Sequence, residues 1–131
     1  MASELRVNTL KDASGNNSVG MSTVAGGSAK AWANVPAGGG SFNDSFNTSS
    51  HGDTSTGDGI VNLTNSMSNA NYVVTSAVTV NYVNASYSLR IAPVGTKTTS
   101  NYREQAGQAN SSAVFLFEDR ERLTSVNGDL A

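Results

Sequence analysis

Apolar residues recur at every second position in several short stretches of the chain. The alternation is plainest around Ile60 and Leu63 and again at Tyr87, Leu89 and Ile91. Side chains two residues apart in a strand share one face of a sheet, so this pattern predicts short strands. We expect seven of them, at residues 29–35, 42–49, 59–64, 71–80, 86–93, 99–106 and 112–118.

Segments rich in glycine, serine, asparagine and aspartate separate these stretches, at 36–40, 51–59, 66–71 and 93–96. Such residues are typical of turns. Strands at roughly 10-residue spacing with turn signals between them predict an all-β fold, an antiparallel β-sandwich of jelly-roll-like character. The last predicted strand, 112–118, is nearly all apolar. It is expected to be a central strand, or an edge strand that a neighbouring subunit covers.

Two terminal segments differ from this middle part. Residues 1–29 contain two short apolar patterns, around Leu5 and Val7 and from Val19 to Val24, with turn residues between them. We expect an extended N-terminal arm that lies along another chain. Residues 119–131 begin with dense mixed charge and are expected to form a short C-terminal tail, either solvated or docked on a neighbour. Residues 30–118 are the predicted β-sandwich domain.

Composition favours oligomerisation. Only 37% of the 131 residues are hydrophobic, and the net charge is -2. A chain of this size with so few apolar residues builds a thin core, which natural proteins reinforce with disulfides, metals or further subunits. The chain has no cysteine and a single histidine, so disulfides and a multi-histidine zinc site within one chain are excluded.

Other partners are disfavoured by the same composition. Lysine and arginine are scattered rather than clustered, which argues against nucleic-acid binding. No apolar run approaches the roughly 20 residues that span a bilayer, and residues 1–15 show no secretion signal. We therefore expect no nucleic-acid partner and no membrane insertion.

Candidate chemistry is sparse. The loop from Asp53 to Asp58 has alternating oxygen ligands that suit calcium, but it lacks EF-hand spacing and is more typical of a hairpin turn. His51 stands beside that loop and is expected to be solvated. No Gly-x-Ser-x-Gly motif or evident pair of facing carboxylates marks an active site. We predict no enzymatic activity and name no catalytic, cofactor-binding or metal-binding residue.

Aromatic residues admit two interpretations. They could form a platform for sugars, or they could make up the core of a domain that has few large aliphatic residues. We expect the core for Trp32, Phe46 and Tyr72, and any exposed binding face on the strands that carry tyrosine. The aromatic residues concerned are Trp32, Phe42, Phe46, Tyr72, Tyr82 and Tyr87.

A series of short motifs runs from Lys30 to Tyr72. In order they are Lys30-Ala-Trp-Ala-Asn-Val35, a glycine-rich turn, Asp44-Ser-Phe-Asn-Thr-Ser-Ser50, Gly57-Asp-Gly-Ile-Val-Asn-Leu63 and Met67-Ser-Asn-Ala-Asn-Tyr72. This series resembles domains in tail-fibre and related appendage proteins of tailed phages. The leader Leu5-Arg-Val-Asn-Thr-Leu-Lys-Asp resembles the segment that often precedes such domains. Leu63 departs from the pattern, which usually has an aromatic residue there, and the related chains often end soon after the last strand.

The resemblance implies a virion structural protein that is made in the cytoplasm of the host bacterium. The first hypothesis is a homotrimeric fibre or tail-appendage component with a role in assembly or host attachment. Capsid decoration (a cement protein) or a head fibre is the alternative, and a stand-alone carbohydrate-binding module ranks third. The expected partners are other copies of the chain, other virion proteins through residues 1–29 and 119–131, and host surface glycans.

Overall fold

The computed structural model describes residues 3, 5–79, 89–91, 94–109 and 114–131. An N-terminal arm contains β1 (Thr9–Lys11), β2 (Ser18–Gly20) and α1 (Met21–Gly27). The rest of the described chain is built of strands: β3 (Ala29–Val35), β4 (Asp44–Phe46), β5 (Thr48–Ser55), β6 (Asp58–Leu63), β7 (Val73–Val78), β8 (Leu89–Ile91), β9 (Val94–Lys97), β10 (Asn101–Gln105), β11 (Gly107–Ala109), β12 (Phe115–Phe117) and β13 (Arg122–Asn127).

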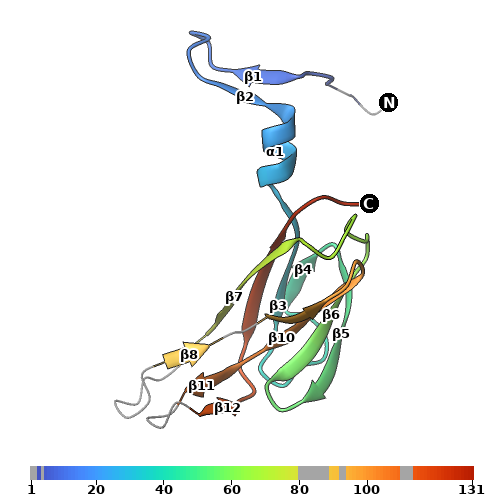
Figure 1. Cartoon of the computed structure of the whole chain (residues 1–131), viewed down its shortest axis with the longest axis vertical. Coiled ribbons are helices and arrows are strands. Elements are labelled where there is room, and N and C mark those ends of the chain that lie inside the picture. Colours follow the sequence, from blue (N-terminus) through green and yellow to red (C-terminus); the bar gives the residue numbers. More distant parts are fainter. Residues whose placement is uncertain (1–2, 4, 80–88, 92–93, 110–113) are drawn as a thin grey trace.

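The strands form antiparallel sheets, and α1 is a single short helix (Figure 1). One four-stranded sheet has the order β5-β6-β10-β9 and the other has the order β4-β3-β13-β7. A three-stranded sheet of order β12-β11-β8 lies at the end of the domain away from the arm (Figure 1). No helix among the described residues is long and apolar enough to cross a membrane.

One buried apolar cluster joins the two four-stranded sheets. The first sheet contributes Val61, Leu63 and Tyr102, and the second contributes β3 and Val126. Small side chains on β3 let the sheets approach closely, because its inward positions are Ala31, Ala33 and Val35. Met67 and Tyr72, from the segment between β6 and β7, close one end of the cluster.

The all-β prediction is confirmed, and several strand positions are too. The predicted ranges 29–35 and 59–64 coincide with β3 and β6 to within one residue at each end. The predicted strand 42–49 is two strands, which part at Asn47 where φ is +54°. The predicted strand 86–93 contains β8, while its other residues up to 88 and at 92–93 lie outside the described residues.

The prediction of a tail at residues 119–131 is wrong for residues 122–127. Residues 122–127 form β13, which pairs with β3 on one side and with β7 on the other. The strand is inconspicuous in the sequence because its inward residues are Arg122, Thr124 and Val126, and two of these are polar. Leu123, the large apolar residue between them, faces outward. Hydrophobic alternation therefore does not predict this inner strand of the sheet, because most of its inward side chains are polar.

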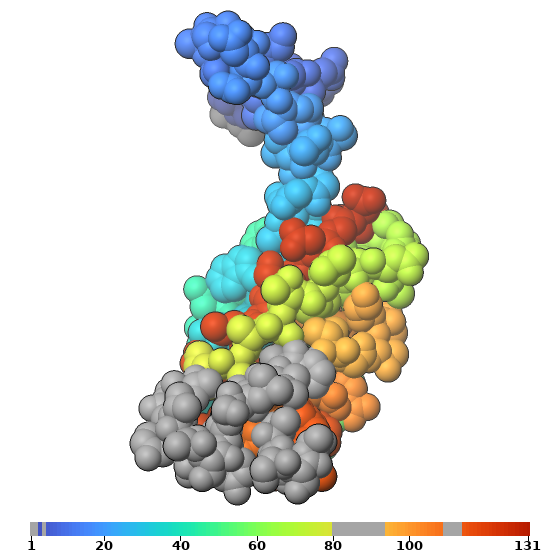
Figure 2. All heavy atoms as spheres, turned by 60° about the vertical axis from the view of Figure 1, so that its left-hand side comes forward, coloured from blue at the N-terminus to red at the C-terminus, as the bar shows by residue number. Residues whose placement is uncertain are grey.

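The N-terminal arm stands clear of the domain (Figures 1 and 2). Its hairpin turn is fixed locally, since the carboxylate of Asp12 accepts hydrogen bonds from Ser14 Oγ, Asn16 N and Asn17 Nδ2. The expectation of a second extended piece from Val19 to Val24 is wrong beyond Gly20, because Met21–Gly27 is helical. None of the described residues from 3 to 28 is buried.

Candidate functional site

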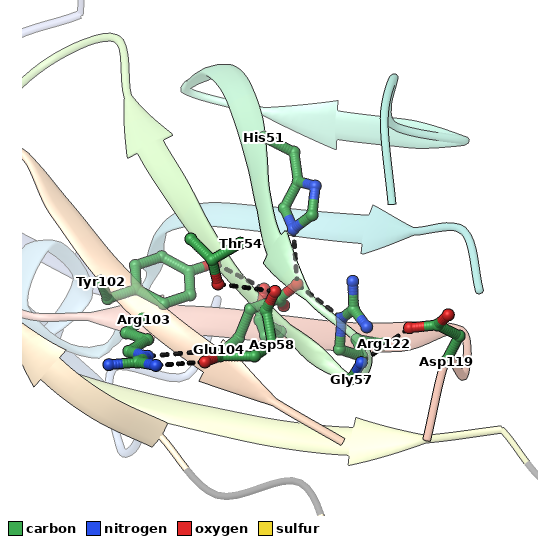
Figure 3. A network of polar contacts seen from close by, with 10 residues as sticks. His51, Thr54, Gly57, Asp58, Tyr102, Arg103, Glu104, Asp119 and Arg122 are labelled. Carbon is green, nitrogen blue, oxygen red and sulfur yellow. Dashed lines mark hydrogen bonds and ion pairs between the residues drawn. The ribbon is translucent and has the colours of Figure 1, made fainter. Parts of the chain in front are cut away.

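The interior of the domain holds a cluster of ionisable side chains, His51, Glu104 and Arg122, which come from β5, β10 and β13 (Figure 3). Arg122 Nε donates to Glu104 Oε1 at 2.7 Å, and His51 Nε2 lies 3.1 Å from the same oxygen. The side chains of His51, Glu104 and Arg122 are 0%, 1% and 2% exposed. A carboxylate with two basic neighbours therefore lies in the protein interior.

The position of His51 corrects the sequence interpretation. The residue belongs to β5 rather than to a solvated turn, and its imidazole points at Glu104 (Figure 3). The ring occupies the space above Gly59, where an added Cβ would lie 2.2 Å from Nε2. Glycine at this position of β6 thus makes room for the histidine.

Several polar atoms of this cluster have no hydrogen-bond partner among the described residues. They include Glu104 Oε2, Arg122 Nη1 and His51 Nδ1, and His51 Nε2 approaches Glu104 without hydrogen-bond geometry. A buried polar atom without a partner costs about 1–3 kcal/mol, more when it is charged. The cluster contains an acid and two bases, and its contacts link β5, β10 and β13 inside the domain.

A second buried contact lies beside the first. Tyr102 Oη and Thr124 Oγ1 are 2.6 Å apart and link β10 to β13 across the two sheets. Burial raises the pKa of the Tyr102 phenol far above its usual value, an effect that the hydrogen bond with Thr124 partly offsets. Strands β10 and β13 therefore meet through one ion pair and one hydroxyl pair, both inside the domain.

The loop that could have bound calcium is the β5–β6 hairpin. Thr56 and Gly57 form its turn, and Gly57 has a φ of +65° that favours glycine. Asp58 forms a two-point ion pair with Arg103, with Oδ1 2.7 Å from Nε. The hydrogen bond from Arg103 holds the pKa of the Asp58 carboxyl below its usual range. In the described part of the chain, no group of three or more His, Asp or Glu residues is placed to hold a metal ion.

Tyr72 is buried, as the sequence predicts. Its hydroxyl lies 2.9 Å from the carbonyl of Thr98 and 2.8 Å from that of Asn101, and it donates to these two oxygens. Burial raises the pKa of Tyr72 to about 12. Tyr72 therefore fastens the segment before β7 to the β9–β10 turn.

Trp32 and Phe46 do not belong to the core, contrary to expectation. Trp32 is 37% exposed and Phe46 is 54% exposed, and they are cross-strand partners on β3 and β4. Ala31, Ala33 and Val35 occupy the inward positions of β3, so Trp32 faces outward. Phe42 packs against the core, while Tyr82 and Tyr87 lie outside the described residues.

Exposed apolar side chains also lie on β12, at the edge of the three-stranded sheet. Leu116 and Phe117 are exposed, and β12 pairs with β11. Gly107 of β11 is required there, because an added Cβ would lie 2.3 Å from the carbonyl oxygen of Leu116. The structure thus agrees with an edge strand in this segment rather than a central one.

None of the sequence motifs pointed to the buried charges. Glu104 falls at an inward position of a predicted strand, between Tyr102 and Ala106, and that alternation was the one available signal. Arg122 belonged to the predicted tail. Comparison with protein families, with curated proteins and with solved structures finds no match to the chain.

Proposed function

We propose that the chain is a structural protein of a tailed-phage virion, a homotrimeric fibre or tail-appendage component. In this proposal residues 30–131 form a β-sandwich in which the two four-stranded sheets pack face to face, and the arm assembles the oligomer. The protein takes part in assembly or host attachment and has no enzymatic activity. It is made in the cytoplasm of the host bacterium and functions in the virion.

The observation that carries the proposal is that none of the described residues of the N-terminal arm is buried. Leu5 is 80% exposed, and Val7, Leu10 and Val24 are exposed as well. An isolated two-stranded hairpin and a seven-residue helix are both marginal in water. Helix α1 also lacks a side-chain cap and charged residues that complement its dipole. Such an arm gains its stability when its apolar side chains pack against other chains, and three copies around an axis achieve this.

The motif series supports the virion context, since it resembles phage appendage domains. The capsid-decoration alternative depended partly on two docking arms. Residues 122–127 are occupied inside the domain by pairing with β3 and β7. The proposal therefore places contacts with other chains on the N-terminal arm, and this favours the fibre over decoration.

Native mass spectrometry of the full chain tests the oligomer. We expect a trimer for the natural sequence and monomers for Leu10→Asp/Val24→Asp, which places charges among the apolar side chains of the arm. The matched control is Thr9→Asp/Ser22→Asp, which adds the same charge at exposed polar positions of β1 and α1. A monomeric natural chain, or a trimer that survives Leu10→Asp/Val24→Asp, would contradict the proposal. Immunogold labelling of virions separates tail from capsid.

A further inference from the structure

The outer face of the sheet β4-β3-β13-β7 presents two ordered rows of side chains. Cross-strand pairing gives the first row as Phe46, Trp32, Ser125 and Thr75. It gives the second row as Asp44, Asn34, Leu123 and Ala77. Figure 2 shows the surface of β3 (cyan), β13 (red) and β7 (yellow-green) side by side and open to solvent. Directly opposed side chains in such a sheet have Cβ atoms about 4.5–5.5 Å apart.

The rows combine an aromatic shelf with a polar surround. Trp32 lies between Phe46 and Ser125, and the neighbouring groups are hydroxyls, an amide and the carboxylate of Asp44. Sugar rings have an apolar C–H face that packs on aromatic rings and a rim of hydroxyls that hydrogen-bond to groups of this kind. Specific small-ligand sites use the same division between apolar contact area and a few placed polar groups.

We propose that this face binds an uncharged saccharide, with one sugar ring stacked on Trp32 and Phe46 and its hydroxyls bound by Ser125 and Asp44, and with Thr75, about two strand spacings from Trp32, in reach of a second ring. The charged groups on this face favour a neutral sugar over an anionic one. Among the described residues, the charged groups of this face are Asp44, Lys30 and, at its edge, Glu121, whose carboxylate accepts hydrogen bonds from the Asn34 and Asn43 side chains. The Lys30 ammonium donates to the carbonyl of Ala25 and to Ser28 Oγ. A carboxylated or phosphorylated sugar would meet Asp44 with no cation of the face directed at it.

The extent of the apolar area favours a small ligand over a second copy of the chain. The exposed fractions of Trp32 and Phe46 correspond to about 200 Å² in total. A stable protein interface needs about 800 Å² from each partner and a continuous apolar centre. Leu123 lies diagonally across from Trp32 and extends the apolar area by one aliphatic side chain, while Ser125 and Asn34 interrupt the area on either side. One or two sugar rings match the shelf in size.

Trp32 is the single tryptophan of the chain, so tryptophan fluorescence reports this face alone. The full-length protein is applied to an array of neutral and anionic glycans. The neutral oligosaccharide that binds best is then titrated by fluorescence and by calorimetry. We expect saturable quenching or a blue shift of Trp32, and for Trp32→Ala a loss of about tenfold or more in affinity, equivalent to 1.4 kcal/mol. Trp32→Phe, which keeps an aromatic shelf, should retain part of the affinity. Val73→Ala, which changes an exposed apolar residue of the same sheet face two strands away from Trp32, is the control and should bind normally.

Each contrary result overturns the inference. These results are no array signal from neutral glycans, binding that Trp32→Ala leaves unchanged, or preference for anionic glycans. A blue shift that appears with protein concentration in the absence of sugar would instead assign the face to a contact between copies. The inference is independent of the proposed trimer, because the arm variants change the oligomeric state and leave Trp32 in place.

Discussion

Removing one partner of the buried ion pair between Arg122 and Glu104 should destabilise the domain severely. Arg122→Met keeps most of the length of the side chain and deletes the charge. Glu104 then retains His51 at 3.1 Å, and its carboxylate loses its hydrogen-bonded partner while it stays 1% exposed. Breaking such a buried pair typically costs about 3–5 kcal/mol, because the remaining charge is left uncompensated in the interior.

The double variant distinguishes this cause from loss of packing. In Glu104→Leu/Arg122→Met neither charge remains, and apolar replacement of a buried pair is often neutral or stabilising by about 1–4 kcal/mol. We therefore expect the double variant to recover most of the stability that Arg122→Met loses. Arg103→Met is the comparison. Arg103 is 45% exposed, but its partner Asp58 is 5% exposed, so the loss should exceed the about 0–1 kcal/mol of a surface pair and stay below that of Arg122→Met, which removes a cation that is itself buried.

Urea unfolding at pH 7 and one fixed protein concentration, followed by far-UV circular dichroism, measures these differences. The concentration is fixed because subunit association would itself change the apparent stability. The urea midpoints of the natural chain and the double variant should be the highest, that of Arg103→Met should be lower, and that of Arg122→Met should be the lowest. The denaturant slopes should be similar. If Arg122→Met lost no more than Arg103→Met, or if the double variant were no more stable than Arg122→Met, the charge argument would be refuted.

Three further predictions concern the same interior. Gly59→Ala should cost about 1–3 kcal/mol by overpacking against His51, and His51→Ala/Gly59→Ala should be more stable than the sum of the single losses by urea unfolding. Tyr102→Phe should cost about 1–2 kcal/mol because it leaves the Thr124 hydroxyl buried and unpaired, and Tyr102→Phe/Thr124→Val should recover part of that loss. For Tyr72 the folded pKa of about 12 exceeds the unfolded value of 10.0, so its contribution is complete below pH 10 and declines as the pH rises towards 12. The urea midpoint should accordingly fall less between pH 9 and 11.5 in Tyr72→Phe than in the natural chain, and an equal fall would contradict the assignment.

The alternation of apolar residues located strands whose inward side chains are apolar. Strand β6 illustrates this, because the pattern around Ile60 and Leu63 predicts it and its inward residues Val61 and Leu63 are apolar. Strand β5 was missed because its inward side chain is His51 in a run of turn-forming residues. Strand β13 was missed for the same reason. Periodicity in hydrophobicity cannot reveal a strand whose inward side chains are polar or ionisable. Such side chains can be buried only with partners from distant parts of the chain, and a local pattern does not show these partners.

The site was less predictable than the fold. Glu104 and Arg122 meet because β10 and β13 belong to two sheets that share one core, and no local pattern encodes that contact. The outward position of Trp32 contradicts the expectation that large aromatic residues fill the core. Two alanines occupy inward positions of β3, so Trp32, which lies between them, faces outward. In a domain with few aliphatic residues, side-chain size was a poor guide to burial.

The inner position of β13 has a consequence for biosynthesis. Ala29 pairs with Asn127, so the strand that links β3 to β7 emerges from the ribosome after nearly the whole domain. Until then both strands present open edges, which are the parts of a sheet that attract other chains. Contacts between such distant residues also slow folding. A nascent chain that stalls before Arg122 would therefore be an aggregation-prone intermediate and a substrate for chaperones.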